Sequence, residues 1–345
     1  MTKLKIAVFG AGLAAAPPFK SLHELDDILE VDWIVLRTTK RFDECKQEFP
    51  HAKITTKIED VVNDGRVDLG LVLTPPNTHL EIAQILASAN IHVLLEKPLE
   101  VNYIRSEKIV RLFQEKNLEL GLMLQHRFRP AAIELKKIIH SKKIGDVLSG
   151  HVSVRWWRDN HYYSEPGRGT YDRDGGGVLI TQAIHTIDLL IYVLGSPKSV
   201  YAQNKTTAVH KIEAEDLSCA IIEFENNVLV SLNATTAAPP GHPESIEISG
   251  TQGSISLKGG ELTIKNIDGR EDKIGINQPY GAGKNPMDFN HGSHKSLIED
   301  FINSIIKKTK PVASGKSALV THQLIFAMTE SAINNKKILL QESPI

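Results

Sequence analysis

The chain has 345 residues, 41% of them hydrophobic and 23% charged, which is ordinary for a globular protein of about two domains. Its 40 basic residues nearly equal its 41 acidic ones, and the formal net charge is −1. This balance gives no electrostatic reason to expect nucleic acid or an anionic membrane as a partner.

Short apolar runs alternate with amphipathic stretches in the first third of the chain. The apolar runs are Leu4–Phe9, Val31–Leu36, Asp68–Leu73, Ile91–Leu95 and Leu118–Leu124, and the amphipathic stretches are Arg41–Phe49, Asn77–Ala89 and Val101–Lys116. Because the runs are nearly continuous rather than alternating, they are typical of strands covered on both faces. This order predicts a Rossmann-type parallel sheet over residues 1–124, a dinucleotide-binding domain.

The pattern changes after residue 125. Val147–Trp157 is a predicted strand and Val178–Val193 a predicted helix, followed by period-two runs at Ser199–Thr206, Ser218–Phe224, Val228–Thr235, Ser245–Ile248, Ser254–Leu257 and Glu261–Ile264. The turns Asn226-Asn227 and Gly259-Gly260 are typical of hairpins. Residues 125–345 are therefore expected to form an α+β domain with a large, mostly antiparallel sheet that binds substrate and mediates oligomerisation.

The remaining elements complete this domain. Residues 268–292 are rich in Gly, Asn, Pro and Asp and are predicted to form a long loop, and the stretches 293–308 and 317–335 are predicted helices. One face of the sheet is expected to lie on helices and the other to be free. Since a free sheet face is a common oligomer interface, a homodimer or homotetramer is expected.

A glycine turn directly follows the first predicted strand. Gly10-Ala11-Gly12-Leu13-Ala14-Ala15 fits G-x-G-x-x-A and precedes a helix. The first glycine allows a tight turn, the second lets the backbone approach a pyrophosphate, and the alanine allows close helix–strand packing. The helix N-terminus then offers free N–H groups to phosphates, so the turn predicts dinucleotide binding.

The end of the second strand bears on which dinucleotide binds. An acidic residue usually stands there to bind the ribose hydroxyls, but this strand ends at Leu36 and continues Arg37-Thr38-Thr39-Lys40. Arg37 and Thr38 would suit a 2′-phosphate, so NADP is favoured over NAD. The structural alternative is a solvated basic start of a helix.

Two further residues have the properties of catalytic groups. Lys97 follows a buried strand at its carboxyl end, where open α/β sheets bind ligands, and its ammonium group would stabilise a developing alkoxide. His185 is a suitable base for a hydroxyl proton, and Thr181, His185 and Asp188 are expected to share one helix face. The glycines at 175–177 are expected to let cofactor or substrate approach the start of this helix. A strand-capping lysine and a histidine paired within the core are the structural alternatives.

The segment Arg155–Arg173 is the predicted substrate wall. It contains Trp156, Trp157, Tyr162, Tyr163 and Tyr171, together with Arg155, Arg158, Arg168 and Arg173. Aromatic faces suit a sugar ring, and arginines suit phosphate or carboxylate. Interleaved acidic residues offset the basic charge and argue against single-stranded nucleic acid, while a loop packed on the sheet is the structural alternative.

Taken in order, these motifs resemble the Gfo/Idh/MocA oxidoreductases, named for glucose–fructose oxidoreductase and inositol dehydrogenase. The resemblance rests on the glycine turn, the segment 74–79 (TPPNTH), the Glu96-Lys97-Pro98 motif, the segment 125–128 (QHRF), the Trp157-Arg158 pair, and the glycines at 175–177 with His185 and Asp188. It implies that Thr74, Pro75, Asn77, His79, Glu96, Lys97, Gln125, Trp157 and Arg158 bind the cofactor and that Lys97 and His185 are catalytic. It also implies substrate binding by Lys97, Arg127, Tyr163, Arg168, Tyr171, Thr181 and His185.

One departure from the family pattern limits the assignment of a substrate. Many members carry Asp four residues before the histidine, and this chain has Thr181 there. The expected function is therefore stated broadly, as an NAD(P)-dependent dehydrogenase or reductase acting on the secondary hydroxyl or keto carbon of a sugar, polyol or nucleotide sugar. A glycosidase that recycles its cofactor and a non-catalytic cofactor- or sugar-sensing regulator are the alternatives, and retention of Lys97 and His185 favours an enzyme.

The cysteines and the N-terminus point to the cytoplasm. Cys45 and Cys219 lie far apart, and their spacing fits no metal site or disulfide framework, as is typical of a reducing compartment. The N-terminus has no apolar stretch of signal-peptide length, and no uncharged apolar run is long enough to span a bilayer. No metal site is expected, since His291 and His294 are interpreted as solvated residues of the polar loop.

Overall fold

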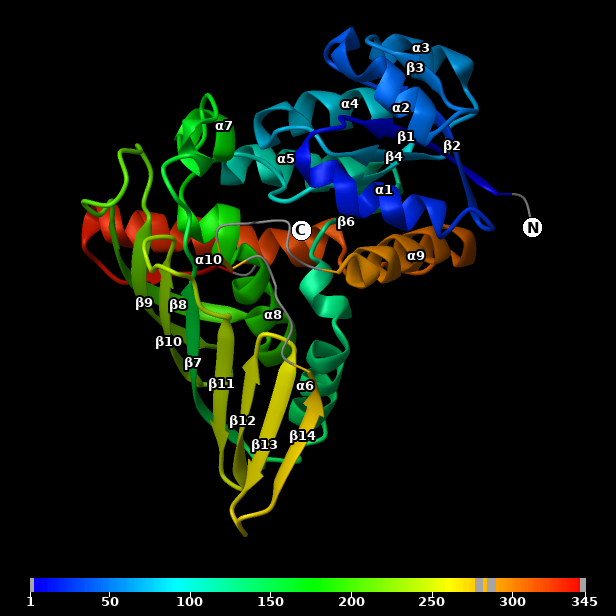
Figure 1. The fold of residues 1–345 in the computed structure, drawn as a ribbon. Helices are drawn as coiled ribbons and strands as arrows, with labels where there is room; N and C mark the ends of the chain where they lie inside the picture. Colours follow the sequence, from blue (N-terminus) through cyan, green and yellow to red (C-terminus); the bar gives the residue numbers. More distant parts are fainter. Residues whose placement is uncertain (1–2, 277–281, 284–289, 342–345) are drawn as a thin grey trace. The chain divides into compact units, whose positions relative to one another are not determined.

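The computed structural model describes residues 3–276, 282–283 and 290–341 and divides the chain into two compact units. Unit 1 comprises residues 1–125 and 291–319, and unit 2 comprises residues 126–290 and 320–345 (Figure 1). The sequence analysis placed everything after residue 124 in the second domain. Residues 291–319 instead pack with the first part of the chain, so each unit is built from two separate stretches of sequence.

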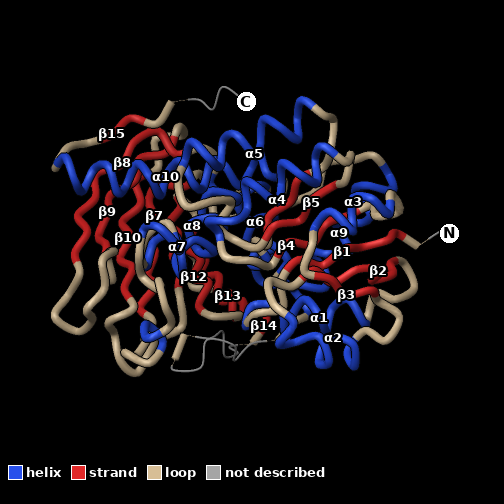
Figure 2. Tube along the Cα trace, turned by 90° about the horizontal axis from the view of Figure 1, so that it is seen from above, coloured by secondary structure: helices blue, strands red, loops and turns tan. Residues whose placement is uncertain are grey.

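Unit 1 is a six-stranded parallel sheet with helices along it, as expected. Its strands are β1 (Leu4–Phe9), β2 (Leu29–Val35), β3 (Lys53–Thr55), β4 (Leu69–Val72), β5 (His92–Leu95) and β6 (Leu120–Leu122). Its helices are α1 (Ala16–His23), α2 (Phe42–Glu48), α3 (Ile58–Asp64), α4 (His79–Ser88), α5 (Tyr103–Glu115) and α9 (Gly292–Lys307). The strand order is β3-β2-β1-β4-β5-β6, which is the doubly wound order with its switch point between β1 and β4 (Figure 2).

Register shows that helices cover both faces of this sheet. Gly70 lies beside Val93, and a side-chain carbon at Gly70 would fall 2.6 Å from Leu86 of α4. Gly121 is paired with Leu94 on the opposite face, and a side-chain carbon there would fall 2.7 Å from the Phe301 ring of α9. The packing of α5 with α4 and of α1 with α9 extends the two layers.

Unit 2 contains the mostly antiparallel sheet. Its strands are β7 (Val147–Arg155), β8 (Pro197–Lys205), β9 (Leu217–Phe224), β10 (Leu229–Thr235), β11 (Ser245–Gly250), β12 (Gly253–Lys258), β13 (Glu261–Asn266), β14 (Glu271–Gly275) and β15 (Ile338–Leu339). The order is β14-β13-β12-β11-β7-β10-β9-β8-β15, with β7 and β10 parallel to each other. The predicted hairpins β9–β10 and β12–β13 are both confirmed.

The helices of this unit cover one face of the sheet. They are α6 (Pro130–His140), α7 (Tyr171–Asp174), α8 (Ile184–Leu194) and most of α10 (Gly315–Asn334). On the covered face, Val152 lies in register with Leu232 and Ile246, and all three are buried. On the other face, Ile221 and Leu229 are exposed, so no helix among the described residues covers them.

Two predicted elements differ from the structure. The predicted loop 268–292 contains β14 and the start of α9, while residues 277–281 and 284–289 of that loop lie outside the described residues. The predicted helix Val178–Val193 begins with a π-helical turn, Leu179–Ala183, before it becomes α8. π turns of this kind are rare and occur often at functional sites.

One helical stretch, Tyr171–Leu194, passes a length and composition test for crossing a membrane, but 89% of its apolar window is buried inside the protein. Ile184, Ile187, Leu190 and Ile191 of this stretch are all core residues. The stretch is therefore best described as the core helix of unit 2.

Candidate active site

The carboxyl ends of the parallel strands carry most of the predicted cofactor-binding residues. Gly10 follows β1 with a φ of 93°, and its N–H donates to the Val35 carbonyl at 2.9 Å. A side-chain carbon at Gly10 would lie 3.1 Å from the Leu73 carbonyl oxygen. Both the left-handed backbone and this close approach require glycine, so the turn holds the ends of β1, β2 and β4 together.

The next residues of the turn leave room for a ligand. Gly12 is exposed, and a side-chain carbon built on it would meet no atom within 4 Å. Ala11 and Ala15 are buried, which lets the helical segment begin close to the sheet. An open backbone at the start of a helix, next to the switch point of the sheet, fits the pyrophosphate of a dinucleotide. The side chain of Leu13 lies outside the described residues.

Arg37 and Thr38 follow β2, and both are exposed. Within the described residues, no hydrogen bond or ion pair engages the Arg37 guanidinium. The two carboxylates of β2, Glu30 and Asp32, lie within the strand rather than at its end, and Asp32 lies 3.4 Å from Arg66. The strand end therefore presents a cation and a hydroxyl to an approaching ribose.

His79 links two of the strand ends from inside the unit. Its Nε2 lies 3.0 Å from the Thr74 carbonyl, and its Nδ1 lies 3.0 Å from the Pro98 carbonyl and 3.1 Å from the Leu99 carbonyl. The residue is fully buried, so the expected contact between His79 and the cofactor is wrong. The ring instead holds the loop after β4 against the loop after β5, and burial lowers its pKa.

The Glu96-Lys97-Pro98 motif directly follows β5, and the Lys97–Pro98 peptide bond is cis. Glu96 donates its N–H to the Val72 carbonyl at 2.7 Å, which fixes the motif to β4. Burial raises the pKa of the Glu96 carboxyl to about 7, and Lys97 opposes part of that rise. The motif therefore places a weakly acidic carboxyl directly beside the lysine.

This shifted carboxyl predicts a pH dependence of stability. Since folded Glu96 keeps a proton that the unfolded chain releases above about pH 4.5, stability falls as pH rises from about 4.5 to about 7. Glu96→Gln removes this contribution. Between pH 5 and pH 8, the free energy of unfolding of the variant is therefore expected to rise by about 2 kcal/mol relative to that of the wild type. Urea unfolding of both proteins at the two pH values measures it, and equal pH slopes would contradict it.

Gln125 stands at the end of the first stretch of unit 1, just beyond β6. Its side-chain oxygen is buried and accepts no hydrogen bond from any described residue. A buried amide oxygen without a donor is costly unless a ligand supplies one. The carboxamide N–H of a nicotinamide has the right chemistry, so Gln125 fits the cofactor proposed for this sheet.

In unit 2, His185 lies in the first turn of α8 and is 6% exposed. Its ring stacks on His126, with the centroids 4.7 Å apart. Arg129 lies 2.5 Å from His126 Nε2 and donates to it, which makes that nitrogen an acceptor and leaves the His126 ring neutral. His126 is a residue that the sequence analysis missed, and its place beside Arg127 was the available signal.

Arg127 forms a buried ion pair within unit 2. Its guanidinium donates to Asp188 at 2.8 and 2.6 Å, and the Thr321 hydroxyl donates to the same carboxylate at 2.9 Å. Arg127 and Asp188 are 2% and 0% exposed. The expected contact of Arg127 with substrate is therefore corrected to a role in anchoring α8, because its charge is already balanced inside the protein. Asp188 is likewise committed to Arg127 and Thr321 rather than to His185.

Thr181 lies within the π turn, so the α-helical spacing that was expected to align it with His185 does not apply. Its hydroxyl contacts the Gly177 carbonyl at 2.6 Å and the side-chain oxygen of Gln182. Gln182 in turn donates to the Tyr162 hydroxyl at 3.1 Å. This chain of contacts connects the helix to the predicted substrate wall, and Gln182 was not identified from the sequence.

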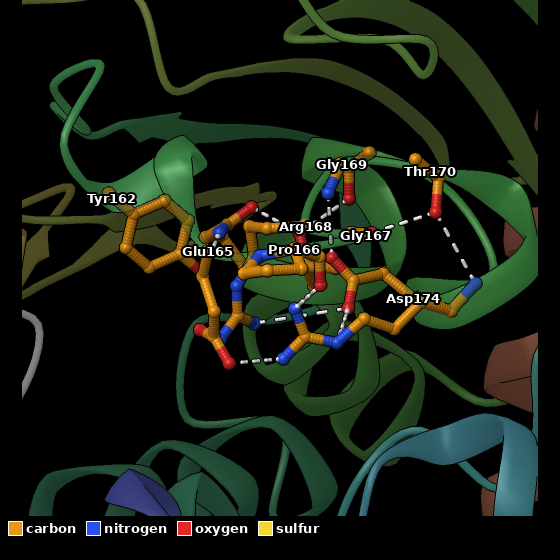
Figure 3. Close-up of polar contacts among 12 residues, drawn as sticks. Tyr162, Glu165, Pro166, Gly167, Arg168, Gly169, Thr170 and Asp174 are labelled. Carbon is orange, nitrogen blue, oxygen red and sulfur yellow. Dashed lines mark hydrogen bonds and ion pairs between the residues drawn. The ribbon is translucent and has the colours of Figure 1, made fainter.

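Ion pairs and hydrogen bonds connect residues within the predicted substrate wall, as Figure 3 shows. Arg168 pairs with Glu165 at 2.6 Å and lies 5.0 Å from the Tyr162 ring centre. The Gly169 N–H donates to Asp174 at 2.8 Å, and Arg173 pairs with Glu165 at 2.5 Å. The loop therefore has a defined shape of its own, and substrate binding by Arg168 competes with these pairs.

Arg158 and Tyr163 belong to a second buried network. Arg158 is 3% exposed and donates to the Trp157 and Gly283 carbonyls at 2.8 and 2.7 Å, and its contact with the cofactor remains a prediction. The Tyr163 hydroxyl bonds to Thr236 at 2.8 Å, and burial raises its pKa. Tyr171 stays partly exposed and available, and substrate contacts by both tyrosines remain predictions.

A buried histidine–aspartate pair supports this segment and was missed in the sequence. His210 contacts Asp216 at 2.8 Å through Nδ1 and the Arg158 carbonyl at 2.7 Å through Nε2. Both ring nitrogens therefore face oxygen atoms of the protein. The two residues lie six positions apart in a polar connection, where the sequence offers no distinguishing pattern.

Comparison with known proteins agrees with this geometry. Residues 4–124 match the oxidoreductase family with an NAD-binding Rossmann fold, and residues 132–256 match the GFO/IDH/MocA C-terminal domain. The chain belongs to the Gfo/Idh/MocA oxidoreductase family. The predicted family and fold are thereby confirmed.

Individual relatives of this Gfo/Idh/MocA protein are distant but cover most of it. The NADP-dependent scyllo-inositol 2-dehydrogenase IolW of Bacillus subtilis is 24% identical over 92% of this chain and 84% of its own. Levoglucosan dehydrogenase of Pseudarthrobacter phenanthrenivorans is 25% identical over 76% of this chain and 77% of its own. The WlbA dehydrogenase of Bordetella pertussis, solved with NADH and UDP-GlcNAcA, is 25% identical, covers 99% of this chain and 100% of its own, and has a TM-score of 0.85.

Across the described parts of the chain, no three histidine, cysteine, aspartate or glutamate side chains form a group that could hold a metal ion. His294, interpreted from the sequence as a solvated loop residue, is buried in α9. His291 contacts Glu24 at 2.7 Å.

Proposed function

We propose that this protein catalyses NAD(P)-dependent hydride transfer between the cofactor and the secondary hydroxyl or keto carbon of a sugar, polyol or nucleotide sugar. The observation that carries the proposal is Lys97, held by Glu96 and Pro98 at the carboxyl end of β5 in the sheet that bears the open glycine turn. Relatives named as inositol and levoglucosan dehydrogenases, and WlbA with its nucleotide sugar, support this substrate class.

The cofactor site is assigned to residues of unit 1. The turn at Gly10 and Gly12 would hold the pyrophosphate, and the buried oxygen of Gln125 would accept from the carboxamide. Thr74, Pro75 and Asn77, which follow β4, would line the same edge of the sheet. When bound, the nicotinamide supplies the hydride acceptor for the reacting carbon.

The chain's own residues then handle the proton. We assign the base to His185, which takes the substrate hydroxyl proton at a ring nitrogen. Lys97 donates a hydrogen bond to the reacting oxygen and stabilises its alkoxide character. In the reverse direction the same residues return a proton to the oxygen.

A screen of substrates tests the proposal. Absorbance at 340 nm would be followed with sugars, polyols and UDP-sugars, each offered with NAD and with NADP. Turnover of at least one alcohol with net formation of reduced cofactor is expected. Cleavage of a glycosidic bond without net oxidation or reduction of the cofactor would indicate the cofactor-recycling glycosidase. Failure to bind either cofactor would overturn the assignment.

The preference for NADP rests on Arg37 and Thr38, since the end of β2 presents no carboxylate. Arg37→Ala is expected to weaken NADP binding about 10- to 100-fold, because a charge-assisted phosphate contact is lost, and to leave NAD binding nearly unchanged. Cofactor fluorescence titrations of wild type and variant measure both affinities. Equal losses of affinity for NAD and for NADP would show that Arg37 does not bind the 2′-phosphate.

We further propose a cytoplasmic homo-oligomer. The open face of the unit 2 sheet, with Ile221 58% and Leu229 53% exposed, supports assembly through that face. Cys45 and Cys219 are both free thiols, which supports a reducing compartment. Light scattering of the purified protein tests the oligomer, and a monomer at micromolar concentration would contradict it.

A further inference from the structure

The helix that carries His185 begins against a buried glutamate from another part of unit 2. Glu215 precedes β9, and its carboxylate accepts from the Gly177 N–H and the Leu179 N–H, both at 3.1 Å. The Val178 N–H donates to the Glu215 backbone carbonyl at 2.8 Å. Three successive N–H groups at the helix start therefore bond to one residue, which satisfies donors that a helix cannot satisfy itself.

The Glu215 backbone lies so close to residue 177 that this position must be glycine. A side-chain carbon at Gly177 would lie 1.7 Å from the Glu215 carbonyl oxygen, so only glycine fits. The sequence analysis expected these glycines to admit cofactor or substrate. At Gly177 itself this space is filled by the protein's own backbone.

The π turn lies directly between this contact and His185. Leu179 donates to Glu215 and opens the turn, which ends at Ala183, two residues before His185. At the other side of His185, Asp188 is fixed by Arg127 and Thr321. His185, in the first turn of α8, thus follows a π turn whose start is held by one buried carboxylate and precedes a second buried carboxylate, Asp188.

We propose that Glu215 is a positioning residue for His185, which sets the place of the histidine ring by clamping the start of the π turn. This inference rests on the proposed function, in which His185 is the base. An unclamped π turn would relax toward an α-helix, because π geometry is the less stable form. That relaxation removes one residue from the turn and rotates His185 relative to the rest of unit 2.

The charge on Glu215 matters as well as its shape. A carboxylate at a helix start is favoured by the helix dipole and by hydrogen bonds from N–H groups. Burial raises the Glu215 pKa, and the neighbouring Asp216 carboxylate acts in the same direction. Tyr171 also faces this group, since Glu215 contributes to the raised pKa of its hydroxyl.

The test compares Glu215→Gln, which keeps the volume, with Glu215→Asp, which keeps the charge. Asp300→Asn is the matched control, because Asp300 also accepts from a backbone N–H (Val312, 2.9 Å) and burial also raises its pKa, but it lies in unit 1. The readouts are hydrogen exchange at residues 177–185, the NMR signal and titration of the His185 ring, cofactor affinity, and turnover. The His185 signal is assigned with His185→Gln.

In Glu215→Gln, the amides of Gly177 and Leu179 are expected to exchange about 10- to 100-fold faster, since each loses a charge-assisted acceptor. The His185 signal is expected to move and its titration midpoint to shift, and turnover to fall about 10-fold at unchanged cofactor affinity. Glu215→Asp should restore part of each effect. Asp300→Asn should leave the His185 signal as in the wild type.

Faster amide exchange at Gly177 and Leu179, with an unchanged His185 signal and full turnover, would overturn the inference. Glu215 would then only cap the helix start without positioning His185. If Glu215→Gln does not fold, Glu215→Asp decides in the same way. Failure of the proposed function is a separate result, since it appears as retained turnover in His185→Gln. The NMR comparison needs no substrate and remains readable in that case.

Discussion

Replacing Lys97 with alanine is expected to lower turnover about 10²- to 10³-fold while cofactor binding persists. The ammonium group is proposed to donate to the reacting oxygen as alkoxide character develops, and removal of one such donor typically has an effect of this size. Lys97 follows β5, whereas the glycine turn follows β1. Loss of the Lys97 side chain should therefore leave the turn at Gly10 and Gly12 unchanged. Steady-state rates at 340 nm and cofactor titrations measure the two quantities.

The matched control is Lys108→Ala, which removes an exposed lysine of α5 in the same unit. Its turnover should equal that of the wild type. Lys97→Arg keeps the charge but changes the donor geometry, so it should recover only part of the activity. Undiminished turnover in Lys97→Ala would refute the proposed role.

The second large effect concerns stability. Arg127→Met is expected to lower the free energy of unfolding by about 3–5 kcal/mol, because it leaves the Asp188 carboxylate buried without its ion partner. The Thr321 hydroxyl would still donate to that carboxylate, but it carries no charge. Urea unfolding followed by tryptophan fluorescence measures this loss, with Trp156 and Trp157 reporting on unit 2 and Trp33 on unit 1.

Two further variants make this result interpretable. Arg127→Met combined with Asp188→Leu should recover most of the loss, since no unpaired charge remains. Arg111→Met breaks the exposed pair with Glu107 on α5 and should cost less than about 1 kcal/mol. If Arg127→Met were no more harmful than Arg111→Met, the ion pair would not be what anchors α8.

Much of the fold follows from local pattern. The first strand was predicted as Leu4–Phe9 and forms with those bounds, because a continuous apolar run before a glycine turn has few alternatives. The hairpins at Asn226-Asn227 and Gly259-Gly260 also formed, since turn residues specify them locally. Short elements such as β3 and β14 were missed, because three to five residues carry too little periodicity to stand out from a polar loop.

The sequence indicated which residues belong to the candidate site better than it indicated what each of them contacts. Arg127, Arg158 and His79 were expected to contact ligands because of the family resemblance, yet each is buried against the protein's own groups. Their partners lie far along the chain, as Asp188 does from Arg127 at a separation of 61 residues. Charge and hydrogen-bonding capacity can be read from a sequence, but the partner that uses them depends on tertiary packing.

The sequence also could not reveal the π turn. Val178–Val193 is mostly apolar, and such a segment predicts a buried helix without specifying its pitch. The extra residue in the turn depends on Glu215, which lies 36 residues beyond Leu179 in the chain. The position of Thr181 relative to His185 changes as a result, and with it the expected shared face.

The discontinuity of unit 1 has a consequence for how the protein is made. The β6 strand lies against residues 313–314 through the Leu122 N–H and a bridge at Gly121, and its Gly121 faces the Phe301 ring. A ribosome must therefore have synthesised the chain as far as residue 319 before the nucleotide-binding unit can be completed. Unit 2, inserted between the two stretches, is largely available earlier, so a nascent chain or a fragment ending near residue 124 would lack α9 and leave that apolar surface uncovered.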